Sequence, residues 1–298
     1  MATTALKGSD LLAWRRQQLA AGGRPVDLDW LLDLGGGLRW AELQKLHLNP
    51  HEVEVQLAVP LELLQQLWNQ HQQHHVPLQH LVGRCPWREL ELEVSSDALI
   101  PRQETELLVD LALEKAAQIY SASPDAPLRW ADLGTGSGAV AVSLARQLPG
   151  WIGHAVDCSP KALALAKRNL ETLVPDRSWQ LHQGSWWEPL RPWWGMLHLV
   201  VSNPPYIPAA VVDQLDPVVR DHEPRLALDG GDDGLDCCRA LVGEACTALA
   251  PGGWLVLEHH HDQSEAVLQL MGGAGLQDAF AAKDLEGVRR FALACHAG

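Results

Sequence analysis

Beyond residue 101 the chain alternates short apolar segments with segments of helical periodicity, and this alternation restricts the fold more than any other feature. Strands are predicted at residues 129–133, 152–156, 179–182, 197–202, 254–258 and 288–295. Helices are predicted at residues 139–147 and 235–249, and a third is expected to begin at Ser159-Pro160, because serine caps helices and proline starts them. The alternation indicates an α/β fold with a doubly wound, mostly parallel sheet, whose ligands bind beyond the carboxyl ends of the strands.

The first 80 residues show a different pattern. Apolar residues recur there at helical spacing in short stretches, such as Trp40, Leu43 and Leu46. Residues 1–80 are therefore predicted to form a small helical bundle, a recognition module for a substrate. From residue 87 to residue 94, leucine and valine alternate with glutamate, which is typical of a strand with one side in solvent. We assign residues 81–100 to a β-hairpin linker and residues 101–298 to the α/β domain.

Composition restricts the partners of the chain. It has 37 acidic and 23 basic residues, a net charge of −14, which disfavours direct binding of nucleic acid through the net field. No apolar run reaches the length of a membrane span, and residues 1–10 lack a signal-peptide pattern. The six cysteines form no C-x-x-C pair, so we expect reduced, buried thiols. These observations favour a cytoplasmic protein without membrane contact, which we expect to be a monomer.

A glycine-rich segment lies between the first predicted strand and helix of the α/β domain. Glycines there permit a tight turn and let a ligand approach the backbone, while the free N–H groups of the helix start attract an anionic group. The alternative is a tight turn without a ligand. The spacing is G-x-G-x-G, not the G-x-G-x-x-G of dinucleotide folds. The candidate residues are Asp132, Gly134, Thr135, Gly136, Ser137 and Gly138.

Asp157 lies 23 residues after Gly134, at the end of the second predicted strand. A carboxylate at this place can accept hydrogen bonds from both hydroxyl groups of a ribose. The alternative is an acidic residue that the dipole of the following helix stabilises. A ribose ligand together with a loop that is not of the dinucleotide type favours S-adenosylmethionine over NAD as the cofactor.

Ser202-Asn203-Pro204-Pro205-Tyr206 ends the fourth predicted strand, where the sheet should open its pocket. The Asn203 side-chain oxygen and the Pro204 carbonyl can each accept one N–H of a planar nitrogen, and two acceptors stabilise the positive charge that grows during its attack. Pro204 and Pro205 restrict the backbone, and Tyr206 offers a flat face for a flat group. The alternative is a rigid proline turn that leaves a strand.

Together these motifs resemble the HemK/PrmC family, the N5-glutamine methyltransferases of peptide chain release factors. Residues 99–106, Leu-Ile-Pro-Arg-Gln-Glu-Thr-Glu, are similar to the interdomain signature of that family, and residues 77–83 to its P-L-Q-Y-I-x-G segment. Asp132–Gly138 resembles the cofactor loop and Asn203–Tyr206 the substrate clamp. The resemblance implies a Rossmann-like S-adenosylmethionine-dependent methyltransferase domain that follows an N-terminal recognition domain.

The resemblance also implies roles for individual residues. Gly134–Gly138 would hold the methionine moiety of S-adenosylmethionine, Asp157 its ribose, and Trp186 would lie beside its adenine. Asn203 would contact both the methyl donor and the substrate. The glutamine amide of a Gly-Gly-Gln loop would bind at Asn203, Pro204, Pro205 and Tyr206, of which Asn203, Pro204 and Tyr206 are the candidate catalytic residues. The N-terminal bundle would help to bind the release factor.

Two alternatives remain open at this stage. The same clamp could methylate adenine N6 in DNA or RNA, although the acidic net charge weighs against that substrate. The chain could also bind the cofactor without turnover. No metal site is predicted, because the histidines at residues 71–75 and 259–261 lack the distant cysteine and histidine partners of a typical site and are interpreted as helix-surface and loop residues.

Overall fold

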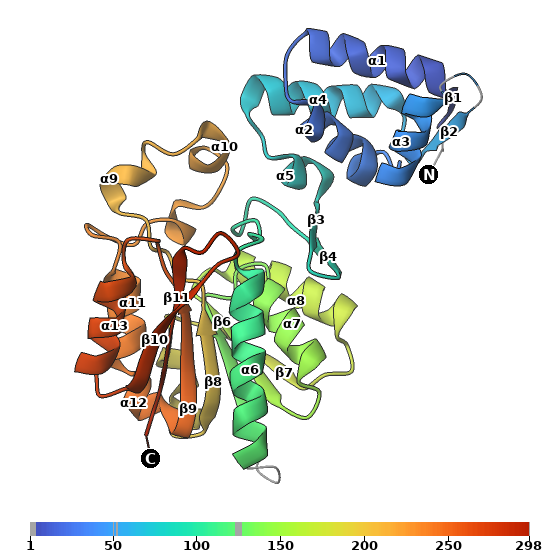
Figure 1. Ribbon diagram of the computed structural model, residues 1–298. Coiled ribbons are helices and arrows are strands. Elements are labelled where there is room, and N and C mark those ends of the chain that lie inside the picture. Colours follow the sequence, from blue (N-terminus) through green and yellow to red (C-terminus); the bar gives the residue numbers. More distant parts are fainter. Residues whose placement is uncertain (1–3, 50, 52, 123–126, 298) are drawn as a thin grey trace. The chain divides into compact units, whose positions relative to one another are not determined.

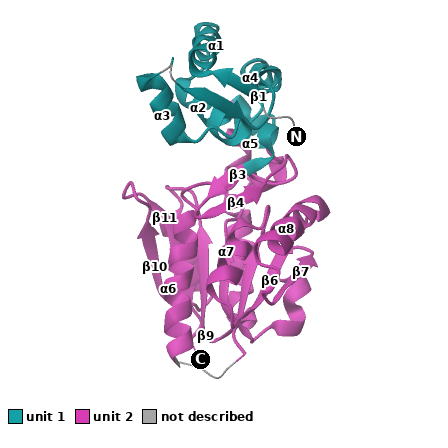
Figure 2. Cartoon of the chain, turned by 90° about the vertical axis from the view of Figure 1, so that its right-hand side faces the viewer, with its two compact units in different colours: residues 1–84, 217–222 teal, residues 85–216, 223–298 magenta. Residues whose placement is uncertain are grey.

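The computed structural model describes residues 4–49, 51, 53–122 and 127–297. Contacts divide the chain into two compact units, coloured separately in Figure 2. Unit 1 comprises Met1–Arg84 and Pro217–His222, and unit 2 comprises Cys85–Asp216 and Glu223–Gly298. Residues 1–3, 50 and 52 of the predicted helical domain, and residues 123–126 and 298 of the predicted α/β domain, lie outside the described residues.

Unit 1 is largely helical, as its periodicity predicts. Its core consists mainly of leucines from all the longer helices, together with Trp68. A short antiparallel pair of strands, β1 (Thr4–Lys7) and β2 (Glu54–Leu57), was not predicted, because each strand has only four residues. The helices are α1 (Gly8–Ala20), α2 (Pro25–Trp30), the π-helical η1 (Leu31–Gly35), α3 (Trp40–Leu48), α4 (Leu61–His74), α5 (Leu78–Val82) and α10 (Pro217–Arg220).

A β-hairpin follows, made of β3 (Arg84–Trp87) and β4 (Leu90–Glu93). The alternating segment from residue 87 to 94 is therefore not one strand, because Arg88 and Glu89 form the turn and Arg88 takes a left-handed backbone conformation with φ 52°. Leu90 and Leu92 are buried in the same core as the sheet of unit 2, while the glutamates of β4 are exposed.

Unit 2 is built on a seven-stranded sheet with the order β10-β11-β9-β8-β5-β6-β7 (Figure 1). The five strands from β9 to β7 are parallel, and β11 and β10 are antiparallel, so the prediction of a doubly wound, mostly parallel sheet is confirmed. The strands are β5 (Arg129–Leu133), β6 (Ile152–Asp157), β7 (Trp179–Gln183), β8 (Leu197–Ser202), β9 (Leu249–Glu258), β10 (Gln277–Lys283) and β11 (Arg289–Cys295).

Helices cover both faces of this sheet, and alternate strand residues supply the two cores. One face packs against α6 (Glu106–Ala122), α7 (Ala139–Gln147) and α8 (Pro160–Leu173). The other packs against the 3₁₀ helix η2 (Glu188–Trp193), α11 (Asp236–Gly243), α12 (Ala245–Ala248) and α13 (Ser264–Gly273). Two short helices, α9 (Ala209–Val212) and the 3₁₀ helix η3 (Arg225–Ala227), lie in the segment after β8.

The predicted helix at residues 235–249 is wrong in one respect. The structure interrupts it at Glu244 and places Leu249 at the start of β9, because Leu249 and Ala250 continue the sheet as buried, extended residues before Pro251. The predicted cap at Ser159 is confirmed, since its hydroxyl accepts a hydrogen bond of 3.2 Å from the backbone N–H of Ala162.

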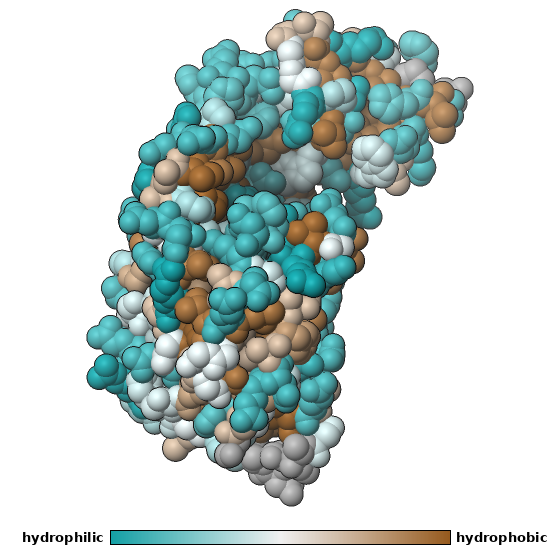
Figure 3. Space-filling model, turned by 60° about the vertical axis from the view of Figure 1, so that its left-hand side comes forward, coloured by the Kyte–Doolittle hydropathy of each residue, from teal (hydrophilic) through white to brown (hydrophobic). Residues whose placement is uncertain are grey.

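The structure bears on two points that the composition raised, membrane spans and cysteines. None of the helices that the structure describes is long and apolar enough to cross a membrane. All six cysteines are free thiols, as predicted. The prediction that they are buried is confirmed for Cys85 and Cys238 and is wrong for Cys158, which is exposed. Hydrophobic side chains on the face drawn in Figure 3 form separate patches among hydrophilic ones.

The strand order explains where a site can form. From β5 the chain moves outward through β6 and β7, and it then returns to place β8 on the other side of β5. At such a switch point the loops after two neighbouring strands diverge and leave a crevice. The glycine-rich segment follows β5 and the Asn-Pro-Pro-Tyr segment follows β8, so both candidate motifs border the same crevice.

Gly153 allows β5 and β6 to lie against each other. Gly153 pairs with Trp130, and a Cβ at residue 153 would lie 2.0 Å from Cζ2 of that fully buried indole. We expect G153A to destabilise the protein by about 3 kcal/mol in urea unfolding, because the packed ring cannot move away without disturbing the core. The matched control is G150A, where the added Cβ meets nothing within 4 Å. Equal stability of both variants would contradict this packing.

Candidate functional site

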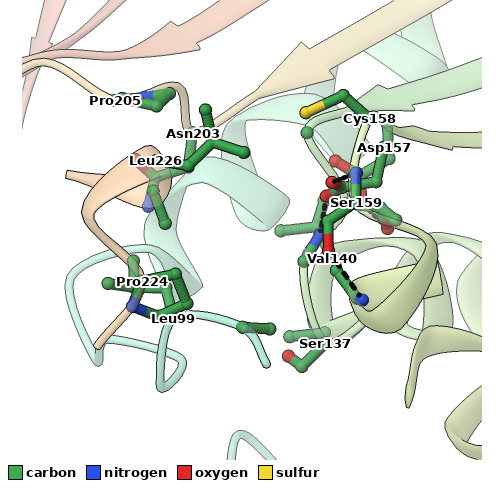
Figure 4. A pocket seen from close by; sticks show the side chains of 18 of the residues that line it. Leu99, Ser137, Val140, Asp157, Cys158, Ser159, Asn203, Pro205, Pro224 and Leu226 are labelled. Carbon is green, nitrogen blue, oxygen red and sulfur yellow. Dashed lines mark hydrogen bonds between the residues drawn. The ribbon is translucent and has the colours of Figure 1, made fainter. Parts of the chain in front are cut away.

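A cavity of about 320 Å³ lies in unit 2 at the carboxyl ends of β5, β6 and β8. That volume is within the range of small-molecule sites in proteins. Figure 4 shows Ser137, Val140 and Asp157 on one side of it and Asn203, Pro224 and Leu226 on the other. The predicted cofactor loop and the predicted clamp therefore face the same space.

The glycine-rich loop depends on backbone conformations that favour glycine. Gly134, Gly136 and Gly138 have φ of 78°, 56° and 84°, all in the left-handed region. A Cβ at Gly134 would lie 3.2 Å from the ring of Trp186, which also lines the cavity. Gly138 is not among the residues that line the cavity, because it caps α7 and lies against Ala166 of α8, where a Cβ would come within 3.1 Å.

Asp132 holds this loop to the following helix. Its Oδ2 accepts hydrogen bonds from the Thr135 hydroxyl at 2.7 Å and from the backbone N–H of Ala141 at 3.1 Å. Burial raises the pKa of this carboxyl to about 7, and the two hydrogen bonds act in the opposite direction. Asp132 is 1% exposed, so its main effect on a ligand is through the shape of the loop.

Asp157 closes the other side of the loop. Its Oδ2 accepts a hydrogen bond from the Gly136 N–H and its Oδ1 accepts one from the Ser159 N–H, both at 2.9 Å. Burial raises the pKa of Asp157, while those backbone hydrogen bonds lower it. Each carboxylate oxygen keeps a further lone pair, so Asp157 can accept from a vicinal diol that lies in the cavity it lines.

The Asn-Pro-Pro-Tyr segment is held from both sides. The Asn203 side-chain amide donates from Nδ2 to the Thr105 hydroxyl at 2.9 Å, and no described residue donates to its Oδ1. The Tyr206 hydroxyl donates to Oε1 of Glu258 at 3.2 Å, and the Gln263 amide donates to the Tyr206 carbonyl at 2.9 Å. Asn203 and Pro205 line the cavity, whereas the buried Pro204 and the half-buried Tyr206 are not among its lining residues.

Several residues of the cavity were not predicted as site residues. Asp97, Ala98, Leu99 and Thr105 come from the segment between the hairpin and α6, and Pro224, Leu226, Ala227 and Asp229 come from the segment around η3. An ion pair of 2.7 Å between Arg102 and the buried Glu223 joins these two segments. The signal for the first segment was the likeness of residues 99–106 to an interdomain signature, and a sequence likeness does not tell where a segment lies in space.

The prediction of no metal site stays a prediction. Among the described residues, His260, His261 and Asp262 bring possible ligand atoms within 4.8 Å of one another. The His260 Nδ1 is already hydrogen bonded to Asp262 at 2.7 Å, and two of the three side chains are exposed. We assign no metal to this group.

The residues of the cavity fit S-adenosylmethionine. The carboxylate of Asp157, the glycine turn and the indole of Trp186 lie around one space of suitable size. Apolar side chains such as Leu99, Val140 and Leu226 complete the wall and suit a flat, weakly polar base. The glycine loop of the cavity has the spacing G-x-G-x-G and not the G-x-G-x-x-G that binds the pyrophosphate of a dinucleotide.

Comparisons with known proteins show what the chain is similar to. Residues 113–220, which hold both motifs, match the family model "Methyltransferase small domain". The chain is 56% identical over 289 residues to the release factor glutamine methyltransferase of Prochlorococcus marinus, covering 96% of both chains. It is 39% identical over 298 residues to the protein of the same name from Synechocystis, covering 97% of both. The solved hMettl16 catalytic domain is similar in fold alone, with a TM-score of 0.53 and 13% identity over 78% of this chain and 80% of that one.

Proposed function

This chain belongs to the release factor glutamine methyltransferase family, and on that premise we propose that it methylates the side-chain amide nitrogen, N5, of the glutamine in the Gly-Gly-Gln motif of peptide chain release factors. The observation that carries the proposal is the placement of Asn203 across one cavity from the glycine loop and Asp157. A carboxamide held at Asn203 would thus lie beside the group that donates the methyl.

The cofactor residues act by shape and by hydrogen bonding. S-adenosylmethionine, when bound, supplies an electrophilic methyl group attached to a sulfonium. Asp157 accepts from the ribose, the glycine loop lets the backbone approach the methionine moiety, and Trp186 lies beside the adenine. Asp132 and Gly138 keep the loop in this conformation. The full set proposed for the cofactor is Asp132, Gly134, Thr135, Gly136, Ser137, Gly138, Asp157, Trp186 and Asn203.

The clamp residues prepare a weak nucleophile. The lone pair of an amide nitrogen is delocalised, so the nitrogen attacks only when its geometry is fixed and its growing positive charge is stabilised. Asn203 Oδ1 and the Pro204 carbonyl accept the two N–H bonds of the glutamine, Pro205 keeps the backbone rigid, and Tyr206 flanks the amide plane. The nitrogen would take the methyl as the carbon–sulfur bond of the sulfonium breaks and leaves a neutral thioether, and the methylated amide would then lose a proton to solvent.

We propose the same domain roles that the sequence indicated: recognition by residues 1–80, a hairpin linker at 81–100 and methyl transfer by 101–298. Trp40 and Leu48, both on α3 of unit 1, are 57% and 78% exposed, and tryptophan is enriched among the residues that dominate binding at protein interfaces. The acidic net charge suits a basic partner protein more than a nucleic acid. Because release factors act on ribosomes, we place the reaction in the cytoplasm, with a monomeric enzyme.

The test compares three substrates in parallel. The full-length chain is incubated with isotope-labelled S-adenosylmethionine and a release factor, the same factor with its Gly-Gly-Gln glutamine replaced by alanine, or double-stranded DNA and RNA of mixed sequence. We expect label in the first sample and none in the others. Label on nucleic acid would favour adenine methylation, and equal label on both release factors would place the methyl elsewhere.

A further inference from the structure

The clamp needs its asparagine in one of two orientations. The oxygen and nitrogen of a carboxamide are nearly equal in size, so packing alone does not distinguish the two orientations of Asn203. Only the orientation that turns Oδ1 to the substrate can accept an N–H from a glutamine. A neighbouring hydrogen-bond partner must therefore select it.

Thr105 provides that partner. Its Oγ1 accepts the Asn203 Nδ2–H at 2.9 Å, and both side chains border the same cavity. A hydroxyl can also donate, however, and a Thr105 that donated to Asn203 would select the reverse orientation of the amide. The Thr105 proton must consequently be directed to another acceptor.

Glu258 is the acceptor that the fold supplies. It ends β9, next to β8 in the sheet, and is 2% exposed. Its Oε1 accepts a hydrogen bond from the Tyr206 hydroxyl at 3.2 Å, while its buried Oε2 has no hydrogen-bond partner among the described residues. The Thr105 hydroxyl lies near enough to lower the pKa of this carboxyl. One buried carboxyl thus binds Tyr206 through Oε1 and keeps Oε2 free to accept the proton of Thr105, the partner of Asn203.

We propose that Thr105 and Glu258 are positioning residues of the methyl transfer, and that the ionised Glu258 accepts from both hydroxyls and so fixes Asn203 with its oxygen toward the substrate. This inference rests on the proposed function and deepens it. Neither residue is required to touch the transferred methyl. Glu258 does not line the cavity, so its effect reaches the reaction through Asn203 and Tyr206.

The pH dependence of the turnover number should report the protonation of Glu258. Burial raises its pKa to about 7, the hydroxyl groups of Thr105 and Tyr206 lower it, Glu104 raises it and Arg290 lowers it. A protonated Glu258 would carry a hydrogen on one oxygen and could no longer accept freely from both hydroxyls. The turnover number is therefore expected to fall as the pH drops through about 7.

The first test exchanges Thr105. T105V keeps the shape of the side chain but loses the acceptor, so we expect kcat with a release factor to fall by about 30-fold. T105S keeps the hydroxyl and is expected to restore most of that loss, which a purely structural role of the methyl group would not allow. T247V, the same exchange at an exposed position of α12, is the matched control and should keep the wild-type kcat. T105V with wild-type kcat, or T105S as impaired as T105V, would overturn the inference.

The second test exchanges Glu258. The amide of E258Q offers one acceptor in place of two, so we expect kcat to fall at least about tenfold and the acid limb of its pH profile near pH 7 to disappear. The affinity for S-adenosylhomocysteine, measured by calorimetry, should stay within about twofold of wild type, and E265Q on the exposed side of α13 is the control. A wild-type kcat and pH profile in E258Q would refute the role of Glu258.

The two proposals can fail separately. If the wild-type protein leaves the Gly-Gly-Gln glutamine unmodified, the proposed function fails. If the wild-type protein methylates it and the T105V and E258Q variants do so equally well, only the positioning network fails. The comparison of T105V with T105S decides the role of the Thr105 hydroxyl even if E258Q does not fold, because both Thr105 variants keep the buried carboxyl.

Discussion

Replacing Asn203 by alanine is expected to lower kcat for release factor methylation by about 10³-fold while the fold survives. The variant removes one of the two acceptors for the glutamine N–H bonds, and the loss of one preorganised group of this kind costs about 10²- to 10³-fold in other enzymes. Asn203 is half-buried at the rim of the cavity and its only side-chain hydrogen bond among the described residues is to Thr105, so little stability is lost. Mass spectrometry of the release factor peptide measures the product.

Two controls accompany N203A. Q269A removes an exposed side-chain amide from α13 that has no part in the clamp, and this variant should methylate the release factor as the wild-type protein does. Circular dichroism of N203A should show a melting temperature close to that of the wild-type protein. Full methylation of the Gly-Gly-Gln glutamine by folded N203A would refute the role of its side chain in the reaction.

Replacing Asp157 by alanine is expected to weaken cofactor binding by at least about 10²-fold. The variant loses the acceptor for two ribose hydroxyls, and hydrogen bonds to a charged group contribute about 1.5–3 kcal/mol each. It also releases the N–H groups of Gly136 and Ser159, which the carboxylate holds at 2.9 Å. Calorimetric titration with S-adenosylhomocysteine measures the dissociation constant.

The same change at Asp176 is the control for D157A. Asp176 is an exposed residue of the turn after α8, and D176A should bind the cofactor as the wild-type protein does. At saturating cofactor D157A should recover much of its kcat, because the clamp is unaltered. A dissociation constant within threefold of wild type would contradict the assignment of Asp157 to the ribose.

The sequence predicts some strands of the sheet more accurately than others. The strands β5, β6 and β8 are buried on both sides and read as short apolar runs, so their predicted bounds differ from the structure by at most one residue. The edge strand β10 has mostly exposed residues and therefore lacks that signal. The break between α11 and α12 also escapes a periodicity argument, because the same apolar residues that suit a helix are used at the start of β9.

The candidate site, too, is predicted only where its residues belong to a local sequence motif. The glycine loop, Asp157 and Asn203 are visible in the sequence because each is a motif at the end of a predicted strand. Thr105 and Glu258 were not predicted as site residues. Their proximity to Asn203 and Tyr206 depends on how distant segments of the chain pack together. The positions of Pro204 and Tyr206 beside the cavity rather than in its wall are likewise a result of the three-dimensional structure.

A crystal structure of the chain with S-adenosylhomocysteine and a Gly-Gly-Gln peptide tests the account most directly. We expect the glutamine side-chain nitrogen within hydrogen-bond distance of both Asn203 Oδ1 and the Pro204 carbonyl, with the cofactor sulfur on the side of the glycine loop. A peptide whose carboxamide binds away from residues 203–206, or a sulfur that lies far from them, would contradict it.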